Sequence, residues 1–98
     1  MQALWIVYDI VLDTEILSLL KKHAVAGYTR WPRLTGTGPQ SGPRLDDHVW
    51  PGANAAVLAV LPDDAVSALF PPLQSLRDEV GHQTGLYAFT VPVLSALK

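Results

Sequence analysis

Residues 3–11 read ALWIVYDIV and residues 54–61 read NAAVLAVL, and these two stretches decide the fold. Neither contains proline, and both are apolar at odd as well as even positions. A half-exposed strand would instead alternate between apolar and polar residues. A strand that is apolar on both sides needs cover on both sides. The two stretches therefore predict central strands of a sheet with both faces buried.

Two further apolar stretches, residues 25–34 and 85–93, predict the outer strands of the same sheet. Each contains a proline, Pro32 in the first and Pro92 in the second. Because proline lacks an N–H group, it cannot donate a hydrogen bond to a neighbouring strand, and it is found at sheet edges or bulges. We therefore expect these two strands at the edges, with the proline-free strands between them.

Apolar residues at helical spacing predict two helices, over residues 13–23 and 63–81. We expect Asp13 or Thr14 to cap the first and Asp63 or Asp64 to cap the second. Pro71 and Pro72 lie inside the second helix, where proline removes backbone hydrogen bonds and restricts the preceding residue. We expect a kink there, or a short restart with proline in the new first turn. The expected buried stripe of the second helix consists of Val66, Leu69, Phe70, Leu73, Leu76 and Val80.

The elements follow one another as strand, helix, strand, strand, helix, strand. This order predicts an α+β fold, the ferredoxin-like βαββαβ sandwich, with an antiparallel sheet in the order 4-1-3-2 when strands are numbered along the chain. Both helices then pack on one face, and the other face is left bare. Because the central strands are apolar there as well, leaving that face in water would forgo several kcal/mol, at roughly 25 cal/mol per Å². We expect a homo-oligomer that buries this face; the alternative is a layer supplied by a different protein.

Length and composition narrow the class of protein. The 98 residues are typical of one domain, 1–98, and 49% of them are hydrophobic against 16% charged. The net charge of −2 argues against nucleic-acid binding, which calls for a basic surface. There is no cysteine, which excludes disulfides and thiolate metal sites. The apolar N-terminus lacks the flanks of a signal peptide and is too short for a membrane helix, so we expect a cytoplasmic protein.

A long loop, residues 35–52, separates the second predicted strand from the third, and loops of this length are usually functional or disordered. The loop and the strand before it are rich in glycine and carry Arg30, Arg33 and Arg44. Glycine lets backbone N–H groups approach an anion, and arginine supplies a planar fork of donors. This region therefore predicts an anion site; the alternative is a flexible loop with solvated arginines.

Two tryptophans, Trp31 and Trp50, flank the base of this loop. On paired strands they would form an ordinary cross-strand aromatic pair. The alternative is that they stack on a ring of the ligand.

The segment Asp46-Asp47-His48 offers oxygen and nitrogen ligands that suit a divalent metal, with Asp47 and His48 as the candidates. Adjacent residues rarely chelate one ion together, however, and the recognised metal-site spacings are absent. The alternative is a polar turn, although an oligomer could bring several copies of His48 together. No pair of residues is arranged for acid–base or nucleophilic catalysis, so we do not expect an enzyme.

The runs Gly27-Tyr28-Thr29 and Gly36-Thr37-Gly38-Pro39-Gln40-Ser41-Gly42 resemble the segment that enters the T-loop of the nitrogen-regulatory PII signalling proteins. In that family a Gly-x-Thr at the second strand is followed by Gly-x-Gly-x-Gln-x-Gly at the base of the loop. The flanks agree: Pro62-Asp63-Asp64 resembles the start of the family's second helix, and residues 85–89 (GLYAF) resemble its last strand.

The resemblance implies a ferredoxin-fold homotrimer that binds an adenine nucleotide or a small anion in clefts between subunits. It implies a T-loop, here about residues 35–52, that docks on a protein target such as a transporter or an enzyme. By the same resemblance, Gln40 contacts the nucleotide or its metal, Gly36 and Gly38 place backbone close to the ligand, and Thr29 lies near the adenine. The resulting candidate set is Thr29, Arg33, Gly36, Gly38, Gln40 and Arg44 for a small ligand, with Asp47 and His48 for a metal.

The chain also departs from the family pattern. The turn Gly81–Gly85 is short and has no Lys or Arg where the family has a basic phosphate loop. The family's C-terminal arginines are absent, and residues 39–50 lack the tyrosine that is modified in the family. The segments around Trp31 and Trp50 fit a divergent PII-like branch. A similarity to the CutA divalent-ion tolerance proteins, which share the fold, is the alternative and implies metal binding; a scaffold without ligand is a third possibility.

Overall fold

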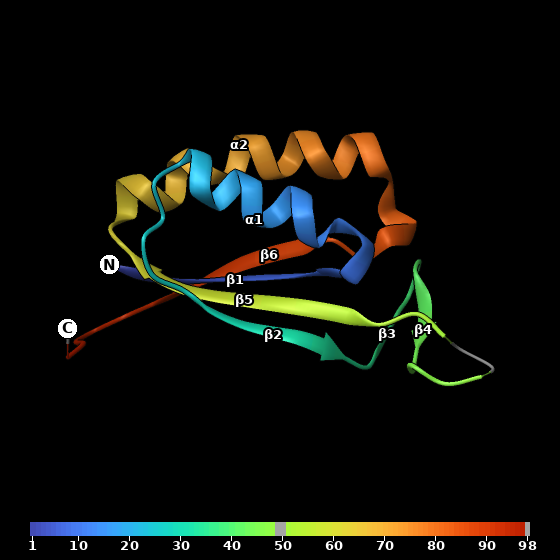
Figure 1. Ribbon diagram of the computed structural model, residues 1–98. Helices are drawn as coiled ribbons and strands as arrows, with labels where there is room; N and C mark the ends of the chain where they lie inside the picture. The colour runs from blue at the N-terminus through green and yellow to red at the C-terminus, as the bar shows by residue number, and fades with distance from the viewer. Residues whose placement is uncertain (49–50, 98) are drawn as a thin grey trace.

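The computed structural model describes residues 1–48 and 51–97, and its main feature is a four-stranded antiparallel sheet in the order β2-β5-β1-β6 (Figure 1). The strands of this sheet are β1 (Gln2–Asp9), β2 (Thr29–Leu34), β5 (Asn54–Leu61) and β6 (Tyr87–Pro92). This is the expected order 4-1-3-2 read from the other edge. The two proline-free strands are central and the two proline-bearing strands are the edges, so the ferredoxin-like fold class is confirmed.

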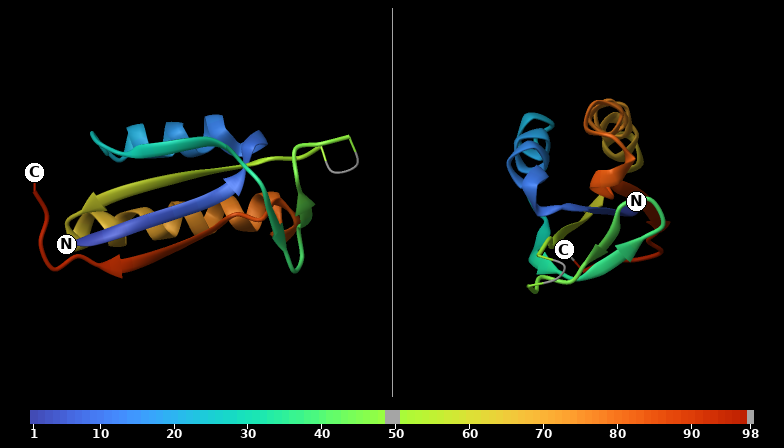
Figure 2. Two further views of the ribbon diagram at one scale, coloured as in Figure 1. Left: turned by 90° about the horizontal axis from the view of Figure 1, so that it is seen from below. Right: turned by 90° about the vertical axis from the view of Figure 1, so that its right-hand side faces the viewer.

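Two helices, α1 (Asp13–Lys22) and α2 (Asp63–Val80), lie side by side on one face of the sheet (Figure 2). Short 3-10 turns precede and follow them: η1 (Ile10–Leu12) leads into α1, and η2 (His82–Thr84) follows α2. Each helix has acidic residues in its first turn and at least one basic residue in its last, which suits the helix dipole. The expected aspartate or threonine caps are wrong, because the helices already begin at Asp13 and Asp63. The N-cap positions are Leu12 and Pro62, and neither makes a side-chain cap hydrogen bond. Within the described residues, no helix has the length and apolar composition needed to cross a bilayer.

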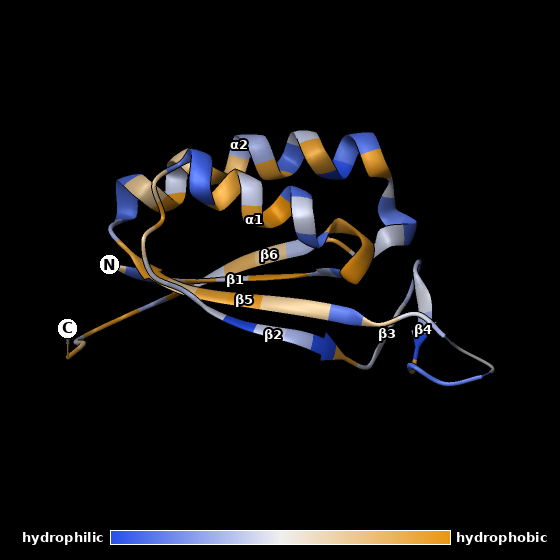
Figure 3. Cartoon of the chain, in the orientation of Figure 1, coloured by the Kyte–Doolittle hydropathy of each residue, from blue (hydrophilic) through white to orange (hydrophobic). Residues whose placement is uncertain are grey.

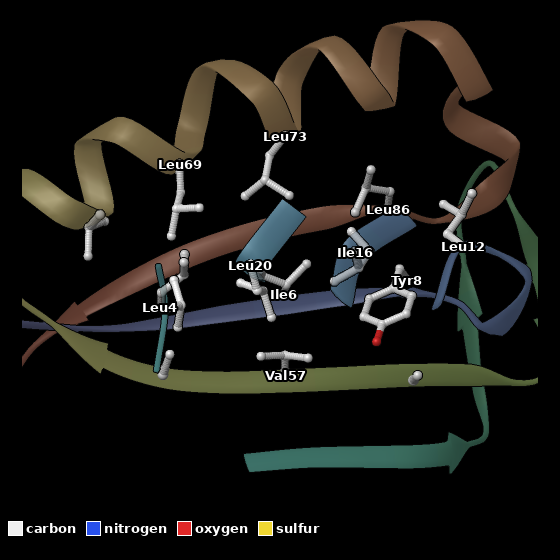
Figure 4. Packing of buried hydrophobic residues seen from close by; sticks show 14 residues of the cluster. Leu4, Ile6, Tyr8, Leu12, Ile16, Leu20, Val57, Leu69, Leu73 and Leu86 are labelled. Atoms are coloured by element: carbon white, nitrogen blue, oxygen red, sulfur yellow. The ribbon is translucent and has the colours of Figure 1, made fainter. Parts of the chain in front are cut away.

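The helix-covered face of the sheet is a closed apolar core. Leu4, Ile6 and Tyr8 alternate along β1 and are all 0% exposed, as expected for side chains that point to one face. Figure 4 shows these residues between the sheet and the leucines of the two helices. The buried residues from the other elements of the core are Leu12, Ile16, Leu20, Val25, Ala55, Val57, Ala59, Val66, Leu69, Leu73 and Leu86.

The opposite face of the sheet, which we call the open face, is also apolar, and neither α1 nor α2 lies over it (Figure 2). The strands β1 and β5 are hydrophobic along most of their length (Figure 3). A row of aromatic rings crosses this face, with ring centroids 5.7 Å apart for Trp31 and Trp5 and 6.2 Å apart for Trp5 and Phe89. Phe89 also stacks on Tyr87. The central strands are thus apolar toward both faces, and the expected cover of the open face stays a prediction.

The second strand is shorter than the predicted 25–34, because residues 25–28 form a connection before β2 begins at Thr29. Val25 packs in the core instead, and its N–H donates to the Leu20 carbonyl at 2.9 Å. The pairing of β2 with β5 shifts register between Trp31 and Leu34, where Pro32 lies. This irregularity is the edge-strand bulge expected from that proline.

The sequence predicted a kink or a restart at Pro71 and Pro72. The helix α2 runs through both prolines as one element, so the restart is wrong, and the kink stays a prediction. Leu69 and Leu73 are buried on either side of the two prolines, and their packing offsets the backbone hydrogen bonds that proline cannot donate. Phe70, which was expected in the buried stripe, is 39% exposed. It lies one residue beyond Leu69 on the helix, and the rotation of about 100° per residue turns it away from the sheet.

The long loop contains a small hairpin that the sequence did not reveal. Its strands are β3 (Gly36–Gly38) and β4 (Gly42–Arg44), joined by the turn 39–41. Gly42 takes a positive φ of 75°, which favours glycine. Figure 1 places this hairpin at the same end of the sheet as the C-terminal end of α2.

Candidate functional site

A pocket of about 670 Å³ lies between the β3–β4 hairpin and the turn after α2. Its floor is part of the open face and is apolar, from Trp5, Val7 and Ala56. One wall is residues 34–41 of the hairpin and its approach. The opposite wall comes from the end of α2, η2 and the start of β6, and consists of Arg77, His82, Gly85, Leu86 and Tyr87. The pocket therefore joins an apolar surface to two walls with polar groups.

The hairpin wall contains Gly36, Gly38 and Gln40, three of the residues predicted from the sequence. A Cβ on Gly36 would lie 3.1 Å from Asn54 Nδ2, and a Cβ on Gly38 would collide with Ser41 Oγ. At both positions the hairpin backbone therefore lies close to a side chain, of its own turn in one case and of the start of β5 in the other. The Asn54 Oδ1 atom is buried without a hydrogen-bond partner in the described part of the chain, and Asn54 also lines the pocket.

The opposite wall contains a cation that sequence reasoning missed. Arg77 lies near the end of α2, and its Nη2 donates to His82 Nδ1 at 2.9 Å. The Arg77 Nε atom is buried and has no partner within residues 1–48 and 51–97. Residues 81–85 contain no Lys or Arg, but a side chain one helical turn before Gly81 reaches the same place.

Arg44 links the two walls of the pocket and is itself only 8% exposed. Its Nε donates to Asp9 Oδ2 at 2.8 Å, and its Nη2 donates to the backbone carbonyl of Gln83 at 2.5 Å. Gly85 leaves room for it, since a Cβ there would lie 3.3 Å from Arg44 Nη1. Arg44 thus ties β4 to the end of β1 and to η2, and it does not line the pocket.

Solved structures share this architecture. One is CPII, a nitrogen regulatory PII-like protein from Thiomonas intermedia K12 bound to ADP, AMP and bicarbonate, with a TM-score of 0.75 and 21% identity over 92% of this chain and 82% of that chain. This chain has the fold of the PII-like proteins. CPII with ADP and bicarbonate matches at a TM-score of 0.73 and 22% identity over 92% and 82% of the two chains.

A candidate PII-like signalling protein from Thermus thermophilus matches at a TM-score of 0.62 and 19% identity, over 92% of this chain and 83% of that one. No protein-family model and no curated protein sequence matches the chain. The resemblance drawn from the loop residues is therefore confirmed as a likeness of fold.

Within this PII-like fold, Arg30 lies on the helix-covered side of the sheet. Its Nε and Nη2 donate to the two Asp13 oxygens at 3.0 and 2.5 Å, and the Tyr8 hydroxyl donates to Asp13 Oδ1 at 2.7 Å. Burial, followed by the Asp13 carboxylate, raises the pKa of the Tyr8 phenol. Burial alone would raise the pKa of Asp13, but the hydrogen bonds from Arg30 and Tyr8 lower it overall. This network fastens α1 to the sheet, away from the pocket.

Arg33 lies outside the pocket lining and forms a two-pronged pair with Asp46, at 2.7 and 3.2 Å. The hydrogen bond from Arg33 lowers the pKa of the Asp46 carboxyl. Both side chains are well exposed, at 58% and 39%. The structure therefore does not bring Arg30, Arg33 and Arg44 together around one anion; each of them meets a carboxylate instead.

The remaining predicted residues lie apart from the pocket lining. Thr29 is exposed on β2 opposite Leu58. Asp47 and His48 are exposed, and the described residues contain no group of three His, Cys, Asp or Glu side chains that could hold a metal. Trp50 lies outside the described residues, so its expected pairing with Trp31 does too.

Proposed function

We propose that this protein is a PII-like regulator that binds an adenine nucleotide or a small anion in the pocket between the β3–β4 hairpin and the turn after α2. The observation that carries the proposal is the position of Gly36, Gly38 and Gln40, which share one pocket wall although the sequence predicted them only by resemblance. Concave sites with an apolar surface and a few convergent polar groups are the usual form of small-molecule sites.

The chemistry of the pocket supports this class of ligand. Its apolar floor, formed by Trp5, Val7 and Ala56, suits the apolar ring system of an adenine, and Gln40 supplies donors and acceptors from the hairpin turn. CPII, which shares the fold, is bound to ADP, AMP and bicarbonate in its structures. The loss of the family's basic phosphate loop is offset by the guanidinium of Arg77 on the facing wall.

The proposed assembly is a homotrimer built on the open face. Tyr87, Phe89 and Val91 on β6 are 50%, 44% and 44% exposed on that face, and burying such large apolar side chains is favourable. The floor of the pocket belongs to the same face, through Trp5 and Val7. A neighbouring copy that covers the open face would therefore also close the pocket, so the proposed ligand site lies at the cleft between subunits.

The proposed output is a signal to a protein target, a transporter or an enzyme, through residues 35–52 of the 1–98 domain. A ligand that binds one arrangement of this segment better than others shifts the population toward it. The wall that would sense the ligand, residues 36–41, is part of the same segment. The protein would act as a regulator rather than as an enzyme, in the cytoplasm.

Calorimetric titration and thermal shift with ADP, AMP, ATP and bicarbonate test the ligand class. A ligand that binds only the folded state raises the unfolding midpoint. We expect at least one of these compounds to bind, and Gln40→Ala to weaken binding about tenfold, the effect of one or two hydrogen bonds. Gln2→Ala is the matched control, because Gln2 contacts Asp63 at the other end of the sheet.

The same panel, extended to copper and zinc, separates the alternatives. Stabilisation by a metal alone, abolished in His48→Ala, would replace the proposal with a CutA-like metal-binding function. No response to any compound would leave a scaffold without a ligand.

A further inference from the structure

We propose that Arg77 and His82 form the subsite for the charged group of the ligand, a phosphate or a carboxylate, and that protonation of His82 strengthens binding there. This inference rests on the proposed function, because it concerns the same pocket. It assigns the anion to a helix residue and a histidine in place of basic residues in the turn Gly81–Gly85, which has none.

A comparison of which arginines pair with carboxylates identifies Arg77 as the cation available to a ligand. Arg30, Arg33 and Arg44 form ion pairs with carboxylates at 2.5, 2.7 and 2.8 Å. Arg77 forms none with the residues that the structure describes, and it lines the pocket. Of the described residues in the pocket lining, none is Asp or Glu. An anion that enters the pocket therefore meets one uncompensated positive charge and no opposing carboxylate.

The hydrogen bonding of Arg77 is incomplete. Its Nη2 is satisfied by His82 Nδ1 at 2.9 Å, but its Nε is buried without an acceptor in the described chain. A buried donor without a partner is unfavourable, because it has lost its hydrogen bond to water without gaining another. A rotation of the guanidinium toward the pocket would give this donor an oxygen of the ligand, and a planar guanidinium suits two oxygens of one phosphate or carboxylate.

The rotation of the Arg77 guanidinium depends on whether the His82 imidazole is protonated. Nδ1 can accept the hydrogen bond from Arg77 only while the imidazole is neutral at that atom. Protonation removes the acceptor and places two positive charges side by side, so Arg77 is released and both groups favour an anion between them. Binding of the anion and uptake of a proton by His82 then reinforce each other.

Few other charged or titratable groups face this pair. On α2, Asp78 and Glu79 follow Arg77, and Asp78 accepts a hydrogen bond from Gln74 at 2.9 Å. Tyr87 lies on the same pocket wall from β6. Behind η2, Arg44 is neutralised by Asp9. The hairpin wall, residues 34–41, contains no charged side chain.

Calorimetric titration of the full chain with ADP and with uncharged adenosine tests the subsite. We expect Arg77→Gln to weaken ADP binding about ten- to a hundredfold, the effect of a charge-assisted hydrogen bond, and to leave adenosine binding unchanged. Arg77→Lys should retain part of the affinity for ADP. Lys22→Gln is the matched control, because Lys22 lies at the end of α1 and outside the pocket lining.

The role of His82 is tested by comparing wild type with His82→Gln at about pH 5.5 and about pH 8, on either side of the range in which histidines change charge. The ratio of the two ADP affinities at each pH cancels the titration of ADP itself. We expect wild type to bind several-fold more tightly than the variant at the lower pH and to take up more protons on binding. Proton uptake is measured from the binding heat in two buffers of different ionisation enthalpy.

The outcomes separate this inference from the proposed function. Binding of ADP that is unchanged in Arg77→Gln would overturn the subsite and leave the proposed function standing. An affinity ratio that does not change with pH would overturn the role of His82. Failure of wild type to bind ADP, AMP or bicarbonate would overturn both. Circular dichroism of each variant shows whether it is folded. If Arg77→Gln does not fold, the affinity of Arg77→Lys for ADP provides the test.

Discussion

The two faces of the main sheet are both apolar, but only one of them is covered by helices. On the helix-covered face, Leu4, Ile6 and Tyr8 of β1 are fully buried. On the open face, Phe89 and Tyr87 remain 44% and 50% exposed, although they stack in a continuous aromatic row. The same strands supply both faces, so the difference comes from the helices alone. The chain therefore completes one core by itself and leaves a second apolar surface exposed, and the floor of the pocket is part of that surface. We propose that a neighbouring copy covers it.

Ile6→Ala should produce the largest loss of stability, because it opens a cavity in the covered core. We expect the free energy of unfolding to fall by about 2–5 kcal/mol in urea denaturation. Its neighbour Val7 points to the open face, so Val7→Ala should lower the free energy of unfolding by less. Because a second copy of the chain is proposed to cover that face, this loss should depend on protein concentration. Equal, concentration-independent losses for the two variants would mean that the faces do not differ as described.

Phe89→Glu should break the assembly without unfolding the subunit. A carboxylate in the middle of the aromatic row would have to lose its water on association, which costs several kcal/mol. We expect the particle mass to fall to that of the monomer while the circular dichroism spectrum is retained. Val11→Glu is the control, since Val11 is 71% exposed in η1, and it should leave the mass unchanged. An unaltered mass in Phe89→Glu would place the interface elsewhere.

Asp13→Asn should cause a smaller loss of stability, because it changes only the hydrogen bonds on the helix-covered side of the sheet. It weakens the hydrogen bonds from Arg30 and Tyr8, and we expect a loss of about 1–2 kcal/mol at neutral pH. The pKa of Asp13 is lowered in the folded state, so its contribution is present above the unfolded pKa and is lost as pH falls through the folded value, below about pH 4. Urea denaturation across this pH range should show a weaker acid dependence in the variant. An identical pH profile would mean that Asp13 does not contribute.

Arg33→Gln should have the smallest effect on stability, because its pair with Asp46 is exposed and belongs to neither face. Exposed ion pairs are screened by water and salt and contribute little. We expect no change in the unfolding midpoint beyond the error of the measurement. A clear drop would show that this pair holds the segment 35–52 in place.

Much of the fold could be predicted from local signals. Proline identified the edge strands correctly, because a residue without an N–H group cannot donate a hydrogen bond to a neighbouring strand. Runs that are apolar at odd as well as even positions identified the central strands. The hairpin inside residues 35–52 was not predicted, since its strands are three residues each and rich in glycine. The exposure of Phe70 depends on how α2 is rotated over the sheet, which periodicity alone did not resolve.

The site was predicted less completely, because charge pairing is a long-range property. Gly36, Gly38 and Gln40 could be identified from one continuous motif, and they share a pocket wall. The arginines could not be sorted in this way. Arg44 finds Asp9 across 35 positions and Arg30 finds Asp13 across 17. Only once these pairs are known does Arg77 stand out as the arginine that faces the pocket without a carboxylate.

The most direct test of the account is the molar mass of the wild-type protein at micromolar concentration, measured by light scattering after gel filtration. If copies of the chain cover the open face and close the pocket, the mass should be three times the 10.6 kDa of one chain. A mass of 10.6 kDa, with the aromatic row left in water, would contradict the account.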